Sequence, residues 1–309
     1  MAIDPQVQQV LDRAAAADAP PLHEQTVEQA RAAHSEATAT LAGPPEDVGA
    51  VLDRAAPGPE GDVAVRVYVP QREPLGIVVF FHGGGWVVGT LDSYDSLCRA
   101  LANAAQSLVV SVDYRLAPEH PFPAAVEDAW SALVWAGESA TALGAPAGRL
   151  VVAGDSAGAN LAAVVARRAR DRGDPRIALQ LLVYPVIDAA MDTPSYTESA
   201  DGYHLEREGM RWFWYHYLAG ADPADPDASP LRAEDVRGVA PALVITVEHD
   251  PLRDEGEAYA QRLEDAGVDV TLRRYDGLTH GVLRWRADVD AAHTMLDHSA
   301  AAIRSALAS

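Results

Sequence analysis

The chain has 309 residues, a formal net charge of -21 and 49% hydrophobic residues. That length suits one large α/β domain or two small ones. The acidic charge disfavours nucleic acid and anionic membrane surfaces as partners, because both repel a negative surface. No apolar run approaches the roughly 18 residues that a membrane span requires, so we expect no membrane-spanning segment.

The first twenty residues and the cysteine content bear on location. The opening stretch contains acidic residues and lacks a basic segment followed by an apolar run, so we do not interpret it as a secretory signal. Cys98 is the only cysteine, which excludes an intrachain disulfide and a thiolate metal cage. Both observations favour a reducing cytoplasm.

Two helical patterns, at 3–17 and 24–41, precede any predicted strand. Apolar runs then predict strands at 63–69, 77–81, 108–114, 150–154, 179–185, 242–248 and 270–275. Helical patterns lie between and after them, at 92–105, 123–142, 157–172, 256–266 and 288–307. This alternation predicts an α/β fold with a mostly parallel sheet and helices on both faces.

Residues 187–240 contain no convincing strand and include an aromatic-rich helical pattern, so we interpret them as an insertion. We expect residues 1–45 and 187–240 to form a small helical cap. Residues 46–186 and 241–309 would then form the main domain. The predicted last strand, 270–275, lies at an exposed sheet edge, and pairing across a two-fold axis there would give a homodimer.

The segment GDSAG, residues 154–158, joins a predicted strand to a predicted helix. A serine on such a sharp turn has an exposed hydroxyl, and the flanking glycines avoid collisions with neighbouring backbone. The N–H groups of the following helix point towards the same place. An ordinary turn with a helix-capping serine would look similar, but this context favours Ser156 as a nucleophile.

The segment HGGGW, residues 82–86, follows a buried predicted strand. Glycines let backbone N–H donors approach an oxyanion closely, so we expect Gly83 and Gly84 to be donors, with the N–H of Ala157 as the third. His82 is expected to hold the loop by hydrogen bonding. A phosphate-binding loop fits poorly because no lysine follows and neither glycine pattern for phosphates is present.

A serine hydroxyl needs a base, and the base needs a group that orients it. His280 follows a late strand in the segment YDGLTHGV, and Asp250 follows the strand before it. The order Ser156, Asp250, His280 is the order expected of an α/β-hydrolase. His249 is a weaker candidate base. Of the rival acids, Glu248 lies within the strand end, and the other two belong to the first turn of the next helix: Asp254 and Glu255.

Five stretches match a known family in order and spacing: HGGGW (82–86), DYRLAPEHPFPA (113–124), GDSAG (154–158), DPLRDE (250–255) and HG (280–281). From about residue 60 to its end, the chain resembles the bacterial hormone-sensitive lipase-like carboxylesterases of the α/β-hydrolase superfamily. The resemblance implies hydrolysis of small carboxylic esters without metal or cofactor.

The resemblance also implies residue roles. Ser156 attacks the ester, His280 transfers the proton, and Asp250 fixes the imidazole tautomer. Asp155 is expected to brace the loop, and Arg115 and Glu119 to bridge loops near the site. The chain departs from the family in having Ala159 where a second glycine is usual, and Val282 where phenylalanine is frequent. We expect these side chains to line an apolar pocket for short to medium acyl chains: Trp86, Val88, Leu205, Leu252, Val282 and Leu283, with Trp212 a further candidate. For the aromatic residues at 212–217 we favour packing within the cap.

Two alternatives stay open at this stage. An amidase or deacetylase would use the same three residues, and only substrates distinguish it from an esterase. A ligand-binding receptor on a hydrolase scaffold belongs to a different class. Such receptors tend to lose the base or the acid, whereas all three positions are filled here.

Overall fold

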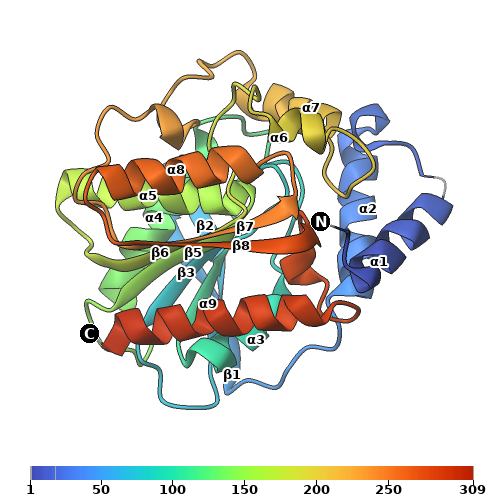
Figure 1. The fold of residues 1–309 in the computed structure, drawn as a ribbon. Helices are drawn as coiled ribbons and strands as arrows, with labels where there is room; N and C mark the ends of the chain where they lie inside the picture. The colour runs from blue at the N-terminus through green and yellow to red at the C-terminus, as the bar shows by residue number, and fades with distance from the viewer. Residues whose placement is uncertain (1, 18, 309) are drawn as a thin grey trace.

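The computed structural model describes residues 2–17 and 19–308. Within them, one eight-stranded sheet has the order β1-β2-β4-β3-β5-β6-β7-β8 (Figure 1). β1 and β2 pair antiparallel, β2 joins β4 antiparallel, and the other pairs are parallel. The strands are β1 Ala50–Gly58, β2 Gly61–Val69, β3 Ile77–Phe81, β4 Leu108–Val112, β5 Leu150–Asp155, β6 Ile177–Val183, β7 Ala242–His249 and β8 Val270–Thr279. The predicted α/β class is confirmed.

Helices cover both faces of this sheet, with α4, α5 and α8 on one side and α3 and α9 on the other (Figure 1). The helices are α1 Pro5–Ala16, α2 Val27–Leu41, α3 Asp95–Ala105, α4 Ala124–Ser139, α5 Ala157–Arg172, α6 Ser195–Glu198, α7 Arg207–Leu218, α8 Arg253–Asp265 and α9 Asp290–Ala308. Short 3-10 helices are η1 Leu22–Glu24, η2 Pro230–Arg232 and η3 Val282–Arg284.

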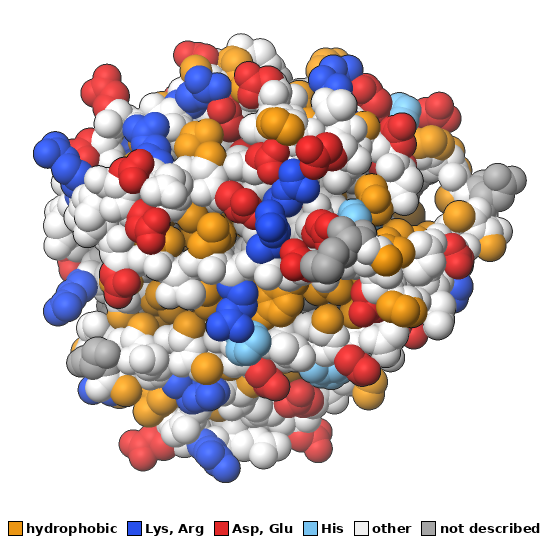
Figure 2. Space-filling model, viewed as in Figure 1, with side chains coloured by type: hydrophobic (Ala, Val, Ile, Leu, Met, Phe, Trp, Pro, Cys, Tyr) orange, Lys and Arg blue, Asp and Glu red, His pale blue; other side chains and the backbone are white. Residues whose placement is uncertain are grey.

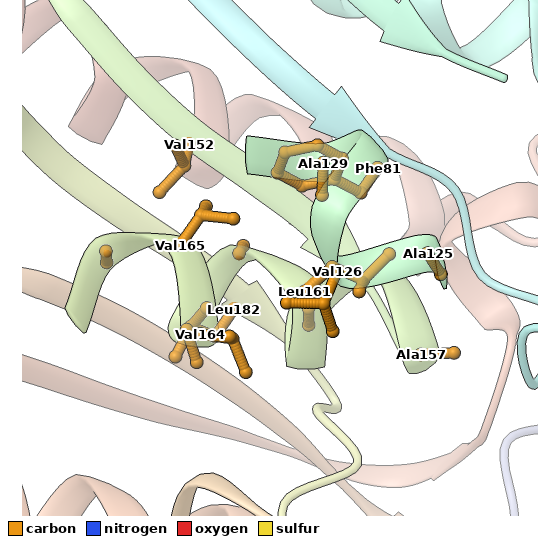
Figure 3. Close-up of a cluster of buried hydrophobic side chains, with 14 of the residues drawn as sticks. Phe81, Ala125, Val126, Ala129, Val152, Ala157, Leu161, Val164, Val165 and Leu182 are labelled. Atoms are coloured by element: carbon orange, nitrogen blue, oxygen red, sulfur yellow. The ribbon is translucent and has the colours of Figure 1, made fainter. Parts of the chain in front are cut away.

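The central strand β3 shows why the chain needs two helical layers. All five of its residues are buried. Successive side chains point to opposite faces, so Phe81 joins the cluster under α4 and α5 while Phe80 joins the cluster under α3 and α9. Figure 3 shows the first cluster, in which Leu161 of α5 and Val126 of α4 lie side by side and to which Phe81 also belongs. A continuously apolar strand is therefore the expected sequence at the centre of a covered parallel sheet.

The strand at the other end of the sheet, β1, was not predicted. Its residues include Asp53 and Pro57, types that are depleted in strands. β1 lies at the sheet edge and pairs with β2 over its whole length, from Ala50 opposite Val69 to Gly58 opposite Gly61. Proline is tolerated at an edge because no further strand needs its missing N–H.

The N-terminal helices pack beside the sheet rather than on its faces (Figure 1). Val7 of α1 is fully buried, and the N–H of Asp4 donates to the carbonyl of Gly277 near the end of β8. In α2, Arg31 donates to the Glu119 carboxylate and to the carbonyl of Val87. α2 is therefore fixed to the segments that follow β3 and β4.

The segment at 113–124 is braced as the sequence suggested. Arg115 donates to both carboxylate oxygens of Asp128 and pairs with Glu60. Glu119 pairs with Arg31 of α2. Each of these two residues therefore links separate parts of the chain near the end of β4, which confirms the expected bridging.

Residues 187–240 hold α6, α7 and η2 and no strand, as predicted. In Figure 1, α7 lies near the upper end of α2, and it packs against η1. Glu255 of α8 fixes the start of this segment, because its buried carboxylate accepts hydrogen bonds from the backbone N–H groups of Ile187 and Asp188. Burial raises the pKa of Glu255 well above its usual value.

β8 forms the open edge of the sheet, opposite β1. Leu272 is 45% exposed there, and Figure 2 shows a band of hydrophobic side chains crossing this face amid charges of both signs.

No helix in the described residues is long and apolar enough to cross a membrane. The single cysteine, Cys98 of α3, is free and fully buried, and burial raises the pKa of its thiol to about 12.

Candidate active site

Ser156 lies at the joint between β5 and α5, where it is the N-cap residue of the helix. Its backbone angles, φ 57 and ψ -121, are unusual for a residue with a side chain and cost on the order of 1–3 kcal/mol. The hydrogen bond from its N–H to the carbonyl of Val183 holds this geometry at 2.9 Å. Strain of this kind at a strand-to-helix turn is typical of an exposed nucleophile.

The glycines on either side of this turn are required by close backbone approach. A Cβ on Gly154 would lie 2.3 Å from the carbonyl carbon of Gly158. A Cβ on Gly158 would lie 1.9 Å from the carbonyl oxygen of Phe81, at the end of β3. The start of α5 is thus in backbone contact with the glycine loop that follows β3, and no other residue type fits.

We expect Gly158→Ala to destabilise the protein by about 3 kcal/mol or more, because overpacking here meets rigid backbone. Chemical denaturation measures this. Gly209→Ala in α7 is the matched control, because its Cβ would meet only Leu22 at 3.4 Å, an ordinary contact. That change should be neutral or stabilise the helix by up to about 1 kcal/mol. Equal stability of the two variants would contradict the steric argument.

His280 and Asp250 lie beside Ser156, each just after its strand, β8 and β7. His280 Nε2 is 2.9 Å from Ser156 Oγ, and His280 Nδ1 is 2.8 Å from Asp250 Oδ2. The N–H of Leu252 donates to the other oxygen of Asp250 at 2.9 Å. Asp250 is fully buried, and Ser156 and His280 are 7% and 6% exposed.

These contacts determine the proton positions. An ionised carboxylate only accepts hydrogen bonds, so His280 Nδ1 carries the proton that faces Asp250. Nε2 is then the lone-pair nitrogen and accepts the hydrogen bond from the Ser156 hydroxyl. The three residues predicted from the sequence are therefore brought together in the arrangement that a base-activated serine requires.

The rival residues have other partners. Asp254 accepts a hydrogen bond from the N–H of Ser195 and pairs with Arg253, and Glu255 holds the segment after β6 as described above. Both belong to the first turn of α8, as predicted. Glu248 accepts from the N–H of Gly277.

The glycine loop differs from the sequence-based prediction at Gly83. Its N–H donates to Asp155 Oδ1 and to the Tyr94 hydroxyl oxygen, both at 2.9 Å. A Cβ here would lie 2.7 Å from Asp155 Oδ2. The assignment of Gly83 as an oxyanion donor is therefore wrong in this structure, because its only N–H is already used to brace the loop.

The next two glycines have free donors. Within residues 2–17 and 19–308, the N–H groups of Gly84 and Gly85 have no hydrogen-bond acceptor. Gly84 has φ 114 and Gly85 has φ 57, and a Cβ on Gly85 would collide with the Phe213 ring of α7 at 2.1 Å. The N–H of Ala157, in the first turn of α5, has no intrahelical partner. The free donors beside the nucleophile are thus those of Gly84, Gly85 and Ala157.

His82 holds the loop, as expected. Its Nδ1 lies 2.7 Å from the carbonyl oxygen of Gly83, and the Tyr114 hydroxyl donates to the carbonyl oxygen of His82 at 2.7 Å. Burial lowers the pKa of His82 to about 4, so the ring stays neutral. Asp155, which accepts from Gly83 and Tyr94, also has the bracing role that the sequence suggested.

The predicted pocket-lining residues differ in exposure. Trp86, Leu252 and Val282 expose no surface in this structure, and their place in the lining stays a prediction. Trp86 stacks on Tyr217 of α7, with ring centroids 4.0 Å apart. The remaining predicted lining residues are 3–6% exposed, and their contact with substrate stays a prediction: Val88, Leu205 and Leu283.

Packing within the cap, favoured from the sequence for the aromatic residues at 212–217, holds for part of α7: Phe213, Trp214 and Tyr217 are buried and Trp212 is partly buried against them, but Tyr215 is 76% exposed. Within the described residues, no group of three or more His, Cys, Asp or Glu side chains is arranged to hold a metal ion.

A cavity of about 1060 Å³ lies at the amino ends of the strands, where residues such as Arg149, Ile177 and Asp269 line it. Ser156 lies at the opposite, carboxyl end of the sheet.

Comparison with known proteins identifies the family. A family model described as the alpha/beta hydrolase fold matches residues 78–284, which include the glycine loop, the Ser156 turn, Asp250 and His280. The chain belongs to this α/β-hydrolase family. The hydrolase is 46% identical over 252 residues to the carboxylesterase NlhH of Mycobacterium tuberculosis, covering 80% of this chain and 79% of the relative. It is 40% identical over 281 residues to an ethyl acetate hydrolase of Pseudomonas putida, covering 88% of each.

Solved structures of similar proteins support the same family assignment. The hydrolase matches a hyperthermophilic esterase from Pyrobaculum calidifontis with a TM-score of 0.93 and 40% identity over 99% of both chains. It matches an ester hydrolase from the metagenome of Lake Arreo with a TM-score of 0.95 and 37% identity, over 99% of this chain and 100% of the other. The predicted membership among the hormone-sensitive lipase-like esterases is confirmed, and the hydrolase is a carboxylic ester hydrolase.

Proposed function

We propose that the protein is a serine carboxylesterase that hydrolyses short- to medium-chain esters through an acyl-enzyme. The observation that carries this proposal is the hydrogen-bonded series from Ser156 Oγ to His280 at 2.9 Å and from His280 to Asp250 at 2.8 Å. These contacts supply the nucleophile, its base and the group that orients the base.

In the first half-reaction, Ser156 Oγ attacks the ester carbonyl carbon while its proton passes to His280 Nε2. The charge that develops on the carbonyl oxygen is held by the N–H groups of Gly84, Gly85 and Ala157. The tetrahedral intermediate collapses, the bond to the alcohol breaks, and His280 returns the proton to the leaving oxygen. Asp250 stabilises the imidazolium in between.

In the second half-reaction, water takes the place of the alcohol. His280 removes a proton from the water as it attacks the acyl carbon, and the same three N–H groups hold the second oxyanion. Collapse breaks the bond to Ser156 Oγ, which recovers its proton from His280. The products are a carboxylic acid and the original enzyme, and no cofactor takes part in these steps.

We propose that residues 1–45 and 187–240 form a cap over this site. Three contacts support it. Arg31 of α2 donates to the carbonyl of Val87, just beyond the glycine loop. Phe213 of α7 lies against Gly85, and His204 lies beside Gly281, next to the catalytic histidine. A cap built so closely onto the site restricts the length of the acyl chain.

Two further expectations stay predictions. A homodimer would form by pairing the exposed edge of β8 across a two-fold axis. The single buried cysteine fits a cytoplasmic location.

The test is hydrolysis of p-nitrophenyl esters from acetate to laurate. We expect kcat/KM to be highest for the short and medium acyl chains and to fall for the longest ones, because the cap limits the space. A matched p-nitroanilide of the best acyl group should react far more slowly. A maximum at laurate would contradict the proposed size range, and faster cleavage of the anilide would indicate an amidase.

A further inference from the structure

Arg284 is a largely buried cation beside Asp155, the residue that precedes the nucleophile, and the reaction steps above do not use it. It lies in η3, four residues beyond His280, and its side chain is 13% exposed. Its Nε is 4.0 Å from Asp155 Oδ2, and its guanidinium carbon lies 5.6 Å from the centre of the Tyr94 ring. Buried arginine is rare unless it is paired, so we asked what the guanidinium group does at this position.

Arg284 and Asp155 interact by charge at 4.0 Å without a hydrogen bond, and Asp155 in turn contacts the glycine loop. The Asp155 side chain is 2% exposed. One carboxylate oxygen accepts from the N–H of Gly83, and the other accepts from the Tyr94 hydroxyl at 3.0 Å. Gly83 directly precedes Gly84 and Gly85, whose free N–H groups are the proposed oxyanion donors. The direction of those donors therefore depends on the position of the Asp155 carboxylate.

The other side of the guanidinium is fixed by α2. Arg284 Nη1 lies 2.9 Å from His34 Nε2 and 3.2 Å from the Thr38 hydroxyl oxygen. Arginine only donates hydrogen bonds, so His34 Nε2 is the lone-pair nitrogen and His34 is neutral. Burial and the Arg284 charge lower the pKa of His34 well below its usual value, so this acceptor persists at neutral pH.

We propose that Arg284 is a positioning residue: from its contacts with α2 it holds the Asp155 carboxylate, and through Gly83 it fixes the oxyanion donors of the glycine loop. The inference rests on the proposed function, because the loop position matters to the rate only if Gly84 and Gly85 bind the oxyanion.

The charge of Arg284 is essential to this role. Burial raises the pKa of Asp155, while Arg284, Tyr94 and the N–H of Gly83 oppose the rise. An uncompensated carboxylate here would take up a proton or move towards water, because an unpaired buried charge is strongly disfavoured. Either change alters the acceptor for Gly83 and turns the loop away from its present position.

The test uses Arg284→Met, Asp155→Asn and the double variant, with p-nitrophenyl acetate as a neutral substrate. Active sites are counted with a phosphonate inhibitor, so that unfolded protein does not contribute. We expect Arg284→Met to lower kcat on the order of 10- to 100-fold, the scale for a misplaced group in the site, with little change in KM. Affinity for a trifluoromethyl ketone, which forms a tetrahedral adduct, should weaken in parallel.

The double variant separates positioning from general destabilisation. If the two charges act together, it should be no slower than the slower single variant, because neither charge is left unpaired. Arg284→Lys, which keeps the charge, should recover part of the lost kcat. Arg286→Met is the matched control, because this arginine is also buried but donates to Ser96 instead, and its kcat should stay within about twofold of the wild type.

Three results would overturn the proposal: an unchanged kcat in Arg284→Met, losses that multiply in the double variant, or an equal loss in Arg286→Met. An effect confined to KM for an ester that carries a carboxylate would instead make Arg284 a substrate-binding residue. Failure of the proposed function has a different signature. In that case Ser156→Ala would keep its activity, whatever the arginine variants do.

Discussion

Replacing Ser156 with alanine is expected to lower kcat for p-nitrophenyl acetate by about 10⁴- to 10⁶-fold, the range for removing a nucleophile that acts with a base. The physical reason is that His280 Nε2 then faces a methyl group, and no other hydroxyl lies within hydrogen-bond reach of it among the contacts that the structure describes. Steady-state rates, with active protein verified by its melting temperature, measure the effect.

The matched control for this variant is Ser299→Ala. Ser299 is a buried serine in α9 whose hydroxyl donates to the carbonyl of Met295, on the other side of the sheet from the Ser156 turn. Its kcat should stay close to that of the wild type. Residual activity in Ser156→Ala above about one hundredth of the wild type would mean that the serine at this turn is not the nucleophile.

Asp250→Asn is expected to lower kcat by about 10³- to 10⁴-fold with little effect on the fold. Asparagine has nearly the same shape, so the hydrogen bond from the N–H of Leu252 can persist. Its amide can turn an N–H towards His280 Nδ1, which moves the imidazole proton to Nε2. A protonated Nε2 cannot take the proton of Ser156, so the nucleophile is no longer activated.

Asp254→Asn is the control that separates this mechanism from general loss of negative charge. Asp254 lies four residues further on and accepts from the N–H of Ser195 rather than from the histidine. It should retain kcat within about threefold of the wild type. A comparable loss in both variants would show that the acid is not specific, and would argue against Asp250 as the orienting residue.

The parts of the site that the sequence predicted correctly depend on local structure. A buried strand, a Gly-x-Ser-x-Gly turn and a helix are consecutive, so Ser156 could be placed from residues 150–172 alone. Asp250 and His280 each follow an apolar run, and carboxyl ends of parallel strands meet at one edge of a sheet. Their convergence therefore followed from the alternation of strands and helices.

The parts that were missed depend on contacts between distant segments. The three glycines at 83–85 are identical in sequence, and only the approach of Asp155 determines which N–H is consumed and which remain free. Arg284 looks like a surface residue from sequence, because its burial requires α2 to lie across it. β1 was missed for the same reason, since its pairing with β2 stabilises residues that have little strand preference of their own.

The pocket residues illustrate a further limit of prediction from sequence. Apolar character near a catalytic motif does not distinguish the lining of a pocket from the layer behind it. Trp86 directly follows the three glycines, but it exposes no surface and packs against the rings of Tyr217 and Trp214. The packing of α7 against that loop determines how much of the Trp86 ring is accessible to a substrate.

The burial of Cys98 has a practical consequence for watching the enzyme at work. A thiol enclosed in α3, with a pKa of about 12, supplies almost no thiolate to an alkylating dye at neutral pH. A cysteine introduced at Tyr215, which is 76% exposed on α7, would therefore carry a fluorescent label alone, with no need to remove the native thiol. Such a reporter would show directly whether α7 moves when an ester binds and an acid leaves.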